Sequence, residues 1–167
     1  LGNLFSRVHR LLQQQCAGRI PKPAAPTFLA EAAVKAQAAY HESISKLAFR
    51  EALDSLWGLV AEADRFLVLH EPWKAAKDPA RADTVPAVMY EAAEAVRIIA
   101  ALAQPFLPDA SASILLALSG EGRCTLHDLA WGGLHEGRPT AASIPPLFPR
   151  VDKAAWFAAH APVHKET

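Results

Sequence analysis

The sequence has little of what marks secreted, membrane or metal-binding proteins. Cysteine occurs only at Cys16 and Cys124, and neither has a second cysteine or a histidine at metal-ligand spacing. We therefore expect two free thiols, as in a protein of the reducing cytosol. No apolar stretch reaches the roughly 20 residues that a membrane-spanning helix needs. The first ten residues carry two arginines and no apolar run, so they do not form a signal peptide.

Recognisable catalytic motifs are also missing. The chain has no glycine-rich nucleotide loop, no nucleophile elbow and no zinc-protease motif. No glutamate is followed three residues later by a histidine, as di-iron and di-manganese bundles require. The pairs His41–Glu42 and His127–Asp128 could be drawn as acid–base dyads, but adjacent helical residues point about 100 degrees apart. We therefore predict no catalytic residue, no metal site and no cofactor in this chain.

The charges balance over the whole chain but not locally. Lysine and arginine number 17 and aspartate and glutamate number 17, which gives a formal net charge of zero. Residues 1–26 nevertheless contain Arg7, Arg10, Arg19 and Lys22 and no acidic residue. A phosphate backbone responds to local charge, so the neutral total does not exclude a nucleic acid as a partner.

The first segment has the periodicity of an amphipathic helix that ends near Gly18. Its opposite sides differ sharply in polarity. Apolar residues recur on one side at Leu1, Leu4, Phe5, Val8, Leu11 and Leu12. The other side carries Asn3, Arg7, Arg10 and Gln14, which fall within an arc of about 60 degrees. We call these four residues the polar ridge and expect it to face solvent or a ligand.

Four further helices are predicted from apolar periodicity and from their proline and glycine boundaries. They cover residues 28–44, 49–71, 86–104 and 108–119. The residues expected to face inward are Phe28, Ala32, Ala36, Ala39 and Ile44 in the first of these, Phe49, Leu53, Leu56, Trp57, Val60 and Leu67 in the second, and Val88, Ala92, Ala95, Ile99 and Leu102 in the third.

No stretch alternates apolar and polar residues long enough to predict a strand. The sequence therefore predicts an all-α fold, a bundle of about five helices over residues 1–120. Beyond Gly120 the periodicity fades into a segment rich in glycine and proline. This composition favours an extended C-terminal tail over residues 121–167, lying on the bundle or on a second domain.

Several separated stretches together resemble the C-terminal half of the bacterial type of methionyl-tRNA synthetase. They are LGNLFSR, LAFREALDSLWGLVAEADRF, EPWKAAKD, PFLPDASASILLALSG, DLAWGGLHEG and PPLFPR, and they cover nearly the whole chain to Arg150. Related class I synthetases for leucine, isoleucine and valine carry a similar helical domain. The WGGLHEG to PPLFPR ending after a Pro-Trp pair is what points to the methionine enzyme.

This resemblance implies a helical domain that reads the CAU anticodon. The family's Asn-x-x-x-Arg pair falls on Asn3 and Arg7, and its Pro-Trp pair falls on Pro72 and Trp73. An amide and a guanidinium can bind base edges or phosphate. An indole fixed by a preceding proline is a platform on which an unstacked loop base can rest. Arg10 shares the polar ridge and is expected to contact phosphate.

The chain departs from the family's pattern in three respects. Glu71 stands beside the proposed platform and is expected to repel phosphate. Asp64 stands where asparagine is common. The nucleotide-binding fold with its HIGH-like and KMSKS-like signatures is missing, so ATP and methionine would bind a separate catalytic domain and this chain should be inactive alone. The implied partners are tRNA(Met) and that catalytic domain in the cytoplasm, with no membrane and no DNA.

Two functions remain open at this point. The first is the anticodon-recognising domain of a methionine-tRNA ligase, which positions tRNA for aminoacylation in protein synthesis; the first residue, Leu1, favours a chain that begins partway through a longer protein. The second is a free-standing, non-catalytic relative that acts as a tRNA-binding or protein-interaction adaptor. A helical enzyme of another class has little support, since no reaction centre is found. The reading frame upstream of Leu1 would separate the first two.

Overall fold

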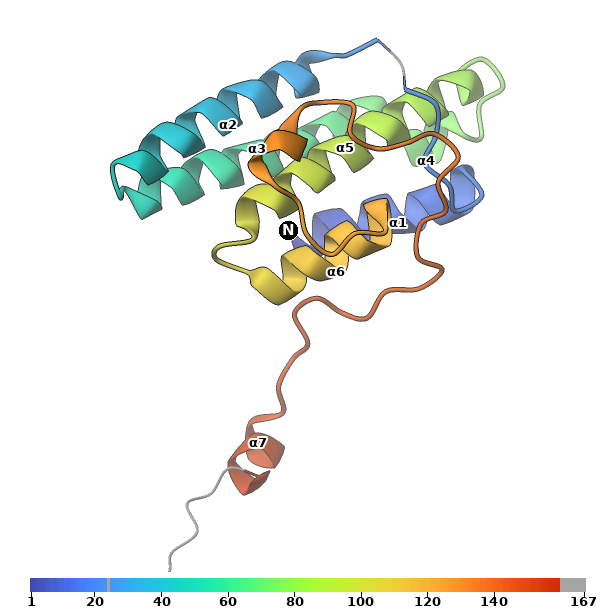
Figure 1. The fold of residues 1–167 in the computed structure, drawn as a ribbon. Helices are drawn as coiled ribbons and strands as arrows, with labels where there is room; N and C mark the ends of the chain where they lie inside the picture. Colours follow the sequence, from blue (N-terminus) through green and yellow to red (C-terminus); the bar gives the residue numbers. More distant parts are fainter. Residues whose placement is uncertain (24, 160–167) are drawn as a thin grey trace, which may run out of the picture.

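Five long helices form the fold in a computed structural model, which describes residues 1–23 and 25–159. They are α1 (Gly2–Gln15), α2 (Phe28–Ser45), α3 (Phe49–His70), α5 (Val85–Ala103) and α6 (Pro108–Ser119). Shorter elements are α4 (Pro72–Ala75), α7 (Lys153–Ala159) and the 3-10 turns η1 (Ala82–Thr84) and η2 (Leu126–Leu129) (Figure 1). No strand occurs in the described residues, so the predicted all-α bundle is confirmed. Helix α4 is an addition, because a single turn has too little periodicity to detect.

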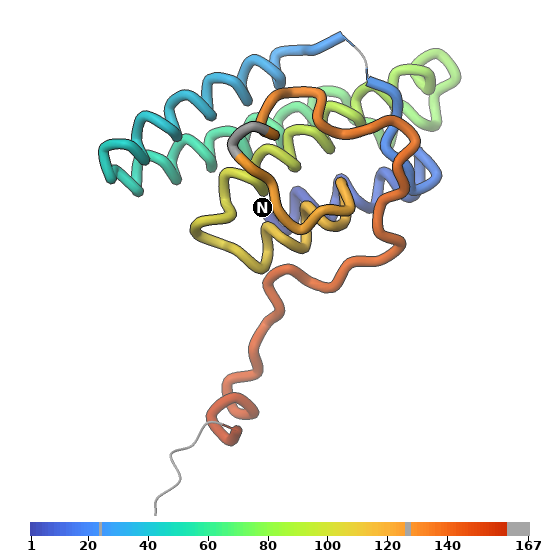
Figure 2. The backbone as a smooth tube through the Cα atoms, viewed as in Figure 1, coloured from blue at the N-terminus to red at the C-terminus, as the bar shows by residue number. Residues whose placement is uncertain are grey.

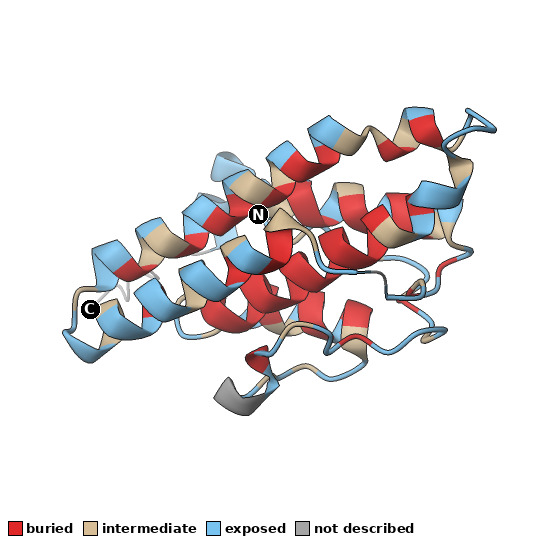
Figure 3. Cartoon of the chain, turned by 90° about the horizontal axis from the view of Figure 1, so that it is seen from above, coloured by how far each residue is buried: buried red, intermediate tan, exposed pale blue. Residues whose placement is uncertain are grey.

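The centre of the bundle is α5. Helices α1, α2, α3 and α6 all contact it, and every residue of α5 except Pro86 and Ala87 is buried (Figure 3). A central helix is buried on all sides, and α5 buries three charged residues, Glu91, Glu94 and Arg97, together with its apolar ones. The inward-facing residues predicted for this helix are all buried, namely Val88, Ala92, Ala95, Ile99 and Leu102. No described helix is both long and apolar enough to cross a bilayer.

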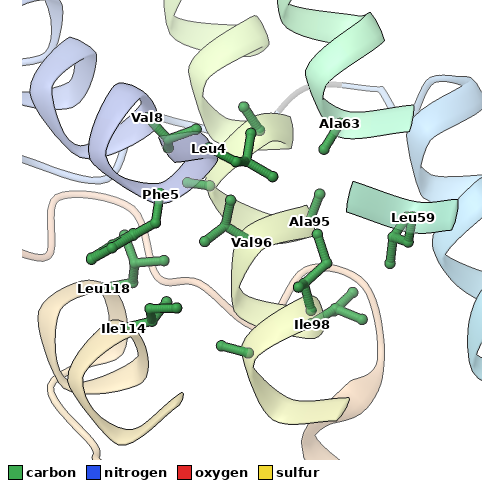
Figure 4. Close-up of a cluster of buried hydrophobic side chains, with 14 of the residues drawn as sticks. Leu4, Phe5, Val8, Leu59, Ala63, Ala95, Val96, Ile98, Ile114 and Leu118 are labelled. Carbon is green, nitrogen blue, oxygen red and sulfur yellow. The ribbon is translucent and has the colours of Figure 1, made fainter. Parts of the chain in front are cut away.

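Helix α1 lies against α5 and α6 with its apolar side inward. The core between these helices contains Leu4, Phe5, Val8, Val96, Ile114 and Leu118 (Figure 4). Asn3, Arg10 and Gln14 on the opposite side are exposed. The predicted division of α1 into a buried side and a polar ridge is therefore confirmed.

The inward faces of α2 and α3 differ from the predicted ones. Helix α2 buries Leu29, Ala30, Ala33 and Tyr40, while the predicted inward residue Ala39 is exposed. On α3, Phe49 and Trp57 are 51% and 42% exposed, so the prediction that Trp57 packs in the core is wrong. The alanines of α2 lie on several sides of the helix and define no narrow stripe. Because α2 and α3 pack on each other at one edge of the bundle, their contact selects the buried faces.

A buried ion pair joins the tail to α5. The Glu94 carboxylate accepts hydrogen bonds from the backbone N–H groups of residues 132–134 at 2.9, 2.8 and 3.1 Å. Arg97 binds the same carboxylate at 2.6 Å and donates to the carbonyl oxygens of Asp128 and Ala130. Burial opposes the charge of Arg97, but the hydrogen bond and the charge of Glu94 outweigh it and raise the pKa of the guanidinium. We call this arrangement the Glu94–Arg97 clamp.

The tail continues from the clamp along α1 and α6. His9 Nε2 and Gln13 Nε2 lie 2.6 and 3.0 Å from the carbonyl oxygen of Ala141. The ring of Phe148 lies against Gly2, where an added Cβ would be 3.1 Å from it. Beyond this point the chain leaves the bundle (Figure 2), and its described part ends with the exposed helix α7. The domain division at residue 120 stays a prediction.

Some positions fall outside the described part of the chain. These are residue 24, residues 160–167 and the side chains of Leu126 and His127. The histidine of the sequence-derived pair His127–Asp128 and the last eight residues of the chain therefore lie outside it as well.

Candidate functional site

The polar ridge places the sequence-predicted residues of α1 on the outer side of the bundle. Asn3 and Arg10 are exposed, and Arg7 between them is half-buried. Asn3 and Arg7 are four residues apart, so their side chains lie on the same helical face one turn from each other. Leu4, Phe5 and Val8 fix the helix from below by burying the other face. A rigid helical support of this kind holds an amide and a guanidinium at a constant spacing.

Arg7 is held by a residue that the sequence does not pair with it. Its Nη1 lies 3.2 Å from Oδ1 of Asp64 on α3, and the two side chains remain 36% and 43% exposed. The contact bridges two helices across 57 positions of sequence. Sequence reasoning noted Asp64 only as an unusual residue, because no periodic pattern reports a contact between separate helices. We call this contact the Arg7–Asp64 pair.

Pro72 and Trp73 lie directly after the end of α3, and we call these two residues the Pro72–Trp73 step. Glu71 adopts a left-handed conformation with φ of 45°, which ends α3, and Pro72 then opens the single turn of α4. Proline suits this first position because it lacks the N–H that the turn leaves unused. Pro72 is buried, and Trp73 is half-buried and packs against the hydrophobic core. Part of the indole is therefore anchored while the rest reaches solvent.

The carboxylate of Glu71 has a cation beside it. Lys74 Nζ lies 2.6 Å from Glu71 Oε1, one turn further along the chain. Arg81 also donates to the carbonyl oxygen of His70 at 2.8 Å, where it adds positive charge to the end of α3. The repulsion of phosphate that Glu71 alone would cause is therefore offset around the step by two basic residues.

The family of the chain follows from comparison with known proteins. Residues 20–143 match the family model described as the anticodon binding domain of methionyl tRNA ligase. The chain belongs to this family. The matched range contains the Pro72–Trp73 step and Asp64 but begins after α1, so the polar ridge lies before it.

Individual relatives agree with this family. Methionine–tRNA ligases of Caldanaerobacter subterraneus and Bacillus subtilis are 33% and 31% identical to the chain over 91% of its length. The chain spans about a quarter of these relatives, 24% of each. Methionyl-tRNA synthetase of Mycobacterium tuberculosis in its free state shares the fold with a TM-score of 0.69 and 24% identity, over 91% of this chain and 32% of that one.

The described residues of this domain contain little other reactive chemistry. No group of three or more histidine, cysteine, aspartate or glutamate side chains in that part of the chain could hold a metal ion. Burial raises the pKa of the Cys16 thiol to about 11, and burial also raises the pKa of Cys124. Both cysteines are free and half-buried. Raised pKa values make them poor nucleophiles.

Proposed function

We propose that this domain binds the anticodon loop of tRNA(Met) and prefers the sequence CAU. Trp73, backed by Pro72, would stack an unpaired base, while Asn3 and Arg7 would contact base edges and Arg10 a phosphate. The single observation that carries this assignment is the half-buried indole of Trp73, held by a buried proline at a helix end. Stacking on a fixed aromatic side chain is how proteins commonly bind single-stranded RNA.

The activity of a whole ligase is a further part of this proposal. The chain would position tRNA for aminoacylation by a catalytic domain that binds ATP and methionine, in the cytoplasm where proteins are made. The free-standing adaptor remains the alternative, and the encoding reading frame upstream of Leu1 decides between them. In either case, the isolated chain should give no methionine-dependent exchange of pyrophosphate into ATP. Exchange activity that copurifies with the chain would contradict this assignment.

The decisive experiment measures RNA binding to the Trp73→Ala variant. Loss of one stacking contact should weaken binding of a CAU anticodon stem-loop by about 1 to 3 kcal/mol, roughly 5- to 150-fold in Kd. The titration should use a second stem-loop with a changed first base, at one fixed salt concentration. Wild-type protein should prefer CAU, and the variant should lose most of this preference.

Two further variants separate binding from folding. Because Trp73 packs against the core, Trp73→Leu keeps an apolar side chain in place while removing the aromatic surface. Trp57→Ala is the matched control, since this tryptophan is exposed on α3 outside the proposed site. It should leave the affinity for both loops unchanged. Equal preference of wild type and folded Trp73→Leu for CAU would show that Trp73 does not read the anticodon.

A further inference from the structure

A pocket opens at the end of the bundle that lies away from the Pro72–Trp73 step. Its volume is about 690 Å³, and it lies between the end of α2, the start of α3, the loop after α5 and the tail residues Cys124 and Leu129. Phe49 at the first position of α3 borders the pocket, whereas Trp73 follows the last position. About 33 Å of helix, 22 residues at about 1.5 Å each, therefore separates the pocket from the step. Sites for small molecules commonly measure about 300 to 1,000 Å³, so the pocket is large enough for one.

The described lining of the pocket contains four aromatic rings and no lysine, arginine, aspartate or glutamate. The rings of Tyr40 and His41 at the end of α2 meet edge to face, with centroids 5.8 Å apart. Those of Phe49 and Phe106 meet in the same way at 6.4 Å. Phe49 is half exposed although its side chain is large and apolar. Such a lining favours a flat, neutral aromatic ring over a charged molecule.

Hydrogen bonds hold the tail in place as one wall of the pocket. Gln104 Nε2 donates to the carbonyl oxygen of Cys124 at 2.8 Å, and the Cys124 N–H donates back to Gln104 Oε1 at 3.2 Å. The hydroxyl of Thr125 donates to the carboxylate of Asp128 at 2.7 Å. These polar groups are thus occupied within the wall, and the pocket is already formed, as small-molecule sites usually are.

Tyr40 provides a polar atom that no such contact occupies. The residue is only 4% exposed, yet its hydroxyl takes part in no hydrogen bond within the described residues. In the same part of the chain, Ser111 Oγ is the one fully enclosed polar side-chain atom without a partner. The Tyr40 hydroxyl therefore borders open space, and the pocket is the open space that Tyr40 lines. Burial raises the pKa of Tyr40, so its hydroxyl keeps its proton at neutral pH and can donate a hydrogen bond.

We propose that this pocket binds a neutral aromatic heterocycle. The ring packs against Phe49 and Phe106, and a ring nitrogen or carbonyl oxygen of the heterocycle accepts a hydrogen bond from the Tyr40 hydroxyl. A buried hydroxyl without a partner is costly, and a purely apolar molecule would fill the volume and leave this cost in place. The inference does not depend on the proposed function, since neither the polar ridge nor the step contributes to the described lining.

Quinoline is a suitable probe, because its ring nitrogen is an acceptor on a flat, neutral ring. Titrated into the wild-type protein at neutral pH, it should shift the backbone amide NMR signals of His41 and Thr125 saturably and leave that of Trp73 in place. Tyr40→Phe should weaken its binding about 2- to 13-fold, as expected for one lost hydrogen bond. Naphthalene has the same shape without the acceptor, so Tyr40→Phe should not weaken its binding. No saturable binding of quinoline, or equal weakening of both probes, would overturn the inference.

A variant that fills the pocket provides the second test. Ile44 on α2 is half-buried and lines the pocket, so Ile44→Trp should occupy the volume and abolish quinoline binding. Val34→Trp is the matched control, because Val34 is exposed on the same helix outside the pocket, and it should bind quinoline as wild type does. Thermal melting checks that both variants fold; if Ile44→Trp does not, Tyr40→Phe decides alone.

Two results of this second test contradict the inference. Undiminished quinoline binding by folded Ile44→Trp would place the probe elsewhere on the protein. A stable wild-type dimer that Ile44→Trp dissociates, measured by sedimentation, would assign the pocket to a second copy of the chain instead of a small molecule.

Discussion

Two arginine–carboxylate pairs in this molecule have the same chemistry and opposite surroundings. In the Glu94–Arg97 clamp the side chains are 0% and 4% exposed, and loop backbone groups saturate the remaining hydrogen-bonding positions. In the Arg7–Asp64 pair both side chains are partly exposed and share one contact. A buried pair must be fully hydrogen-bonded because desolvation of a charge is costly. A surface pair is free to leave atoms open to a ligand.

The position of each pair in the chain adds to this contrast. The clamp lies within one helix, three residues apart, and reaches outward to fix the tail. The Arg7–Asp64 pair connects two helices at the polar ridge. The clamp thus contributes to folding, whereas the other pair contributes to the shape of the proposed binding surface. Substitutions in the clamp should therefore change the stability of the fold, whereas substitutions in the Arg7–Asp64 pair should change RNA binding.

The largest effect is expected from Arg97→Ala. This change leaves the buried Glu94 carboxylate without its cation and orphans the carbonyl oxygens of Asp128 and Ala130. Removing one member of a buried ion pair costs about 3 to 5 kcal/mol, so the free energy of unfolding in urea should fall by that amount. The control Arg50→Ala affects a pair on the surface whose side chains are 90% and 71% exposed, and its stability should stay within about 0.5 kcal/mol of wild type. Similar losses in both variants would abolish the distinction between buried and surface pairs.

A smaller loss is expected from Gly133→Ala. A Cβ at this position would lie 2.7 Å from Cζ of Arg97, whose guanidinium is fixed by its hydrogen bonds. Such overpacking costs about 1 to 3 kcal/mol. Gly58→Ala provides a control of opposite sign, because its added Cβ on α3 meets nothing within 4 Å and helix propensity should stabilise it by about 0.5 to 1 kcal/mol. If Gly133→Ala leaves the free energy of unfolding in urea unchanged, the Arg97 guanidinium is able to shift and make room for the added Cβ.

Features that depend on residues close together in the sequence could be predicted, whereas features that depend on contacts between distant segments could not. Proline and glycine boundaries located the five long helices, and the strong periodicity of α1 placed its buried face correctly. The residues expected to face inward on α5 are buried, but the sequence did not show that nearly the whole helix is. The faces of α2 and α3 were misjudged because apolar residues on several sides leave the choice to tertiary contacts. Glu94 and Arg97 look like an ordinary surface pair in the sequence, since only the loop at residues 128–134 makes their burial possible.

The candidate site shows the same limit. Residue types and a family resemblance were enough to select Asn3, Arg7, Pro72 and Trp73, and their contact with RNA remains a prediction. The contact between Arg7 and Asp64 was not foreseen, because it depends on how α1 lies on α3. Helix packing is set by many side chains at once, so a pair 57 positions apart leaves no trace in local periodicity.

Trp57→Ala tests the corrected position of this tryptophan. A fully buried tryptophan would cost about 3 to 5 kcal/mol when replaced by alanine. Because Trp57 is 42% exposed, we expect a loss of about 1 kcal/mol in urea unfolding, within the usual range for partly exposed sites. Phe66→Leu at a fully buried position of the same helix should cost more. If the order of these two losses is reversed, Trp57 belongs to the core after all.

The smallest effect on stability is expected from Arg7→Ala, the counterpart of Arg97→Ala in the surface pair. Screening by water limits the Arg7–Asp64 contact to at most about 1 kcal/mol, and Asp64 stays hydrated when its cation is removed, since 43% of its side chain is already exposed. The free energy of unfolding should therefore hardly change, while affinity for the CAU stem-loop should fall because a base or phosphate contact is lost. Gln14→Ala on the same ridge controls for the exposed surface of α1. A loss of stability comparable to that of Arg97→Ala, with RNA binding intact, would mean that the Arg7–Asp64 pair stabilises the fold. The two pairs would then differ in their location and not in their role.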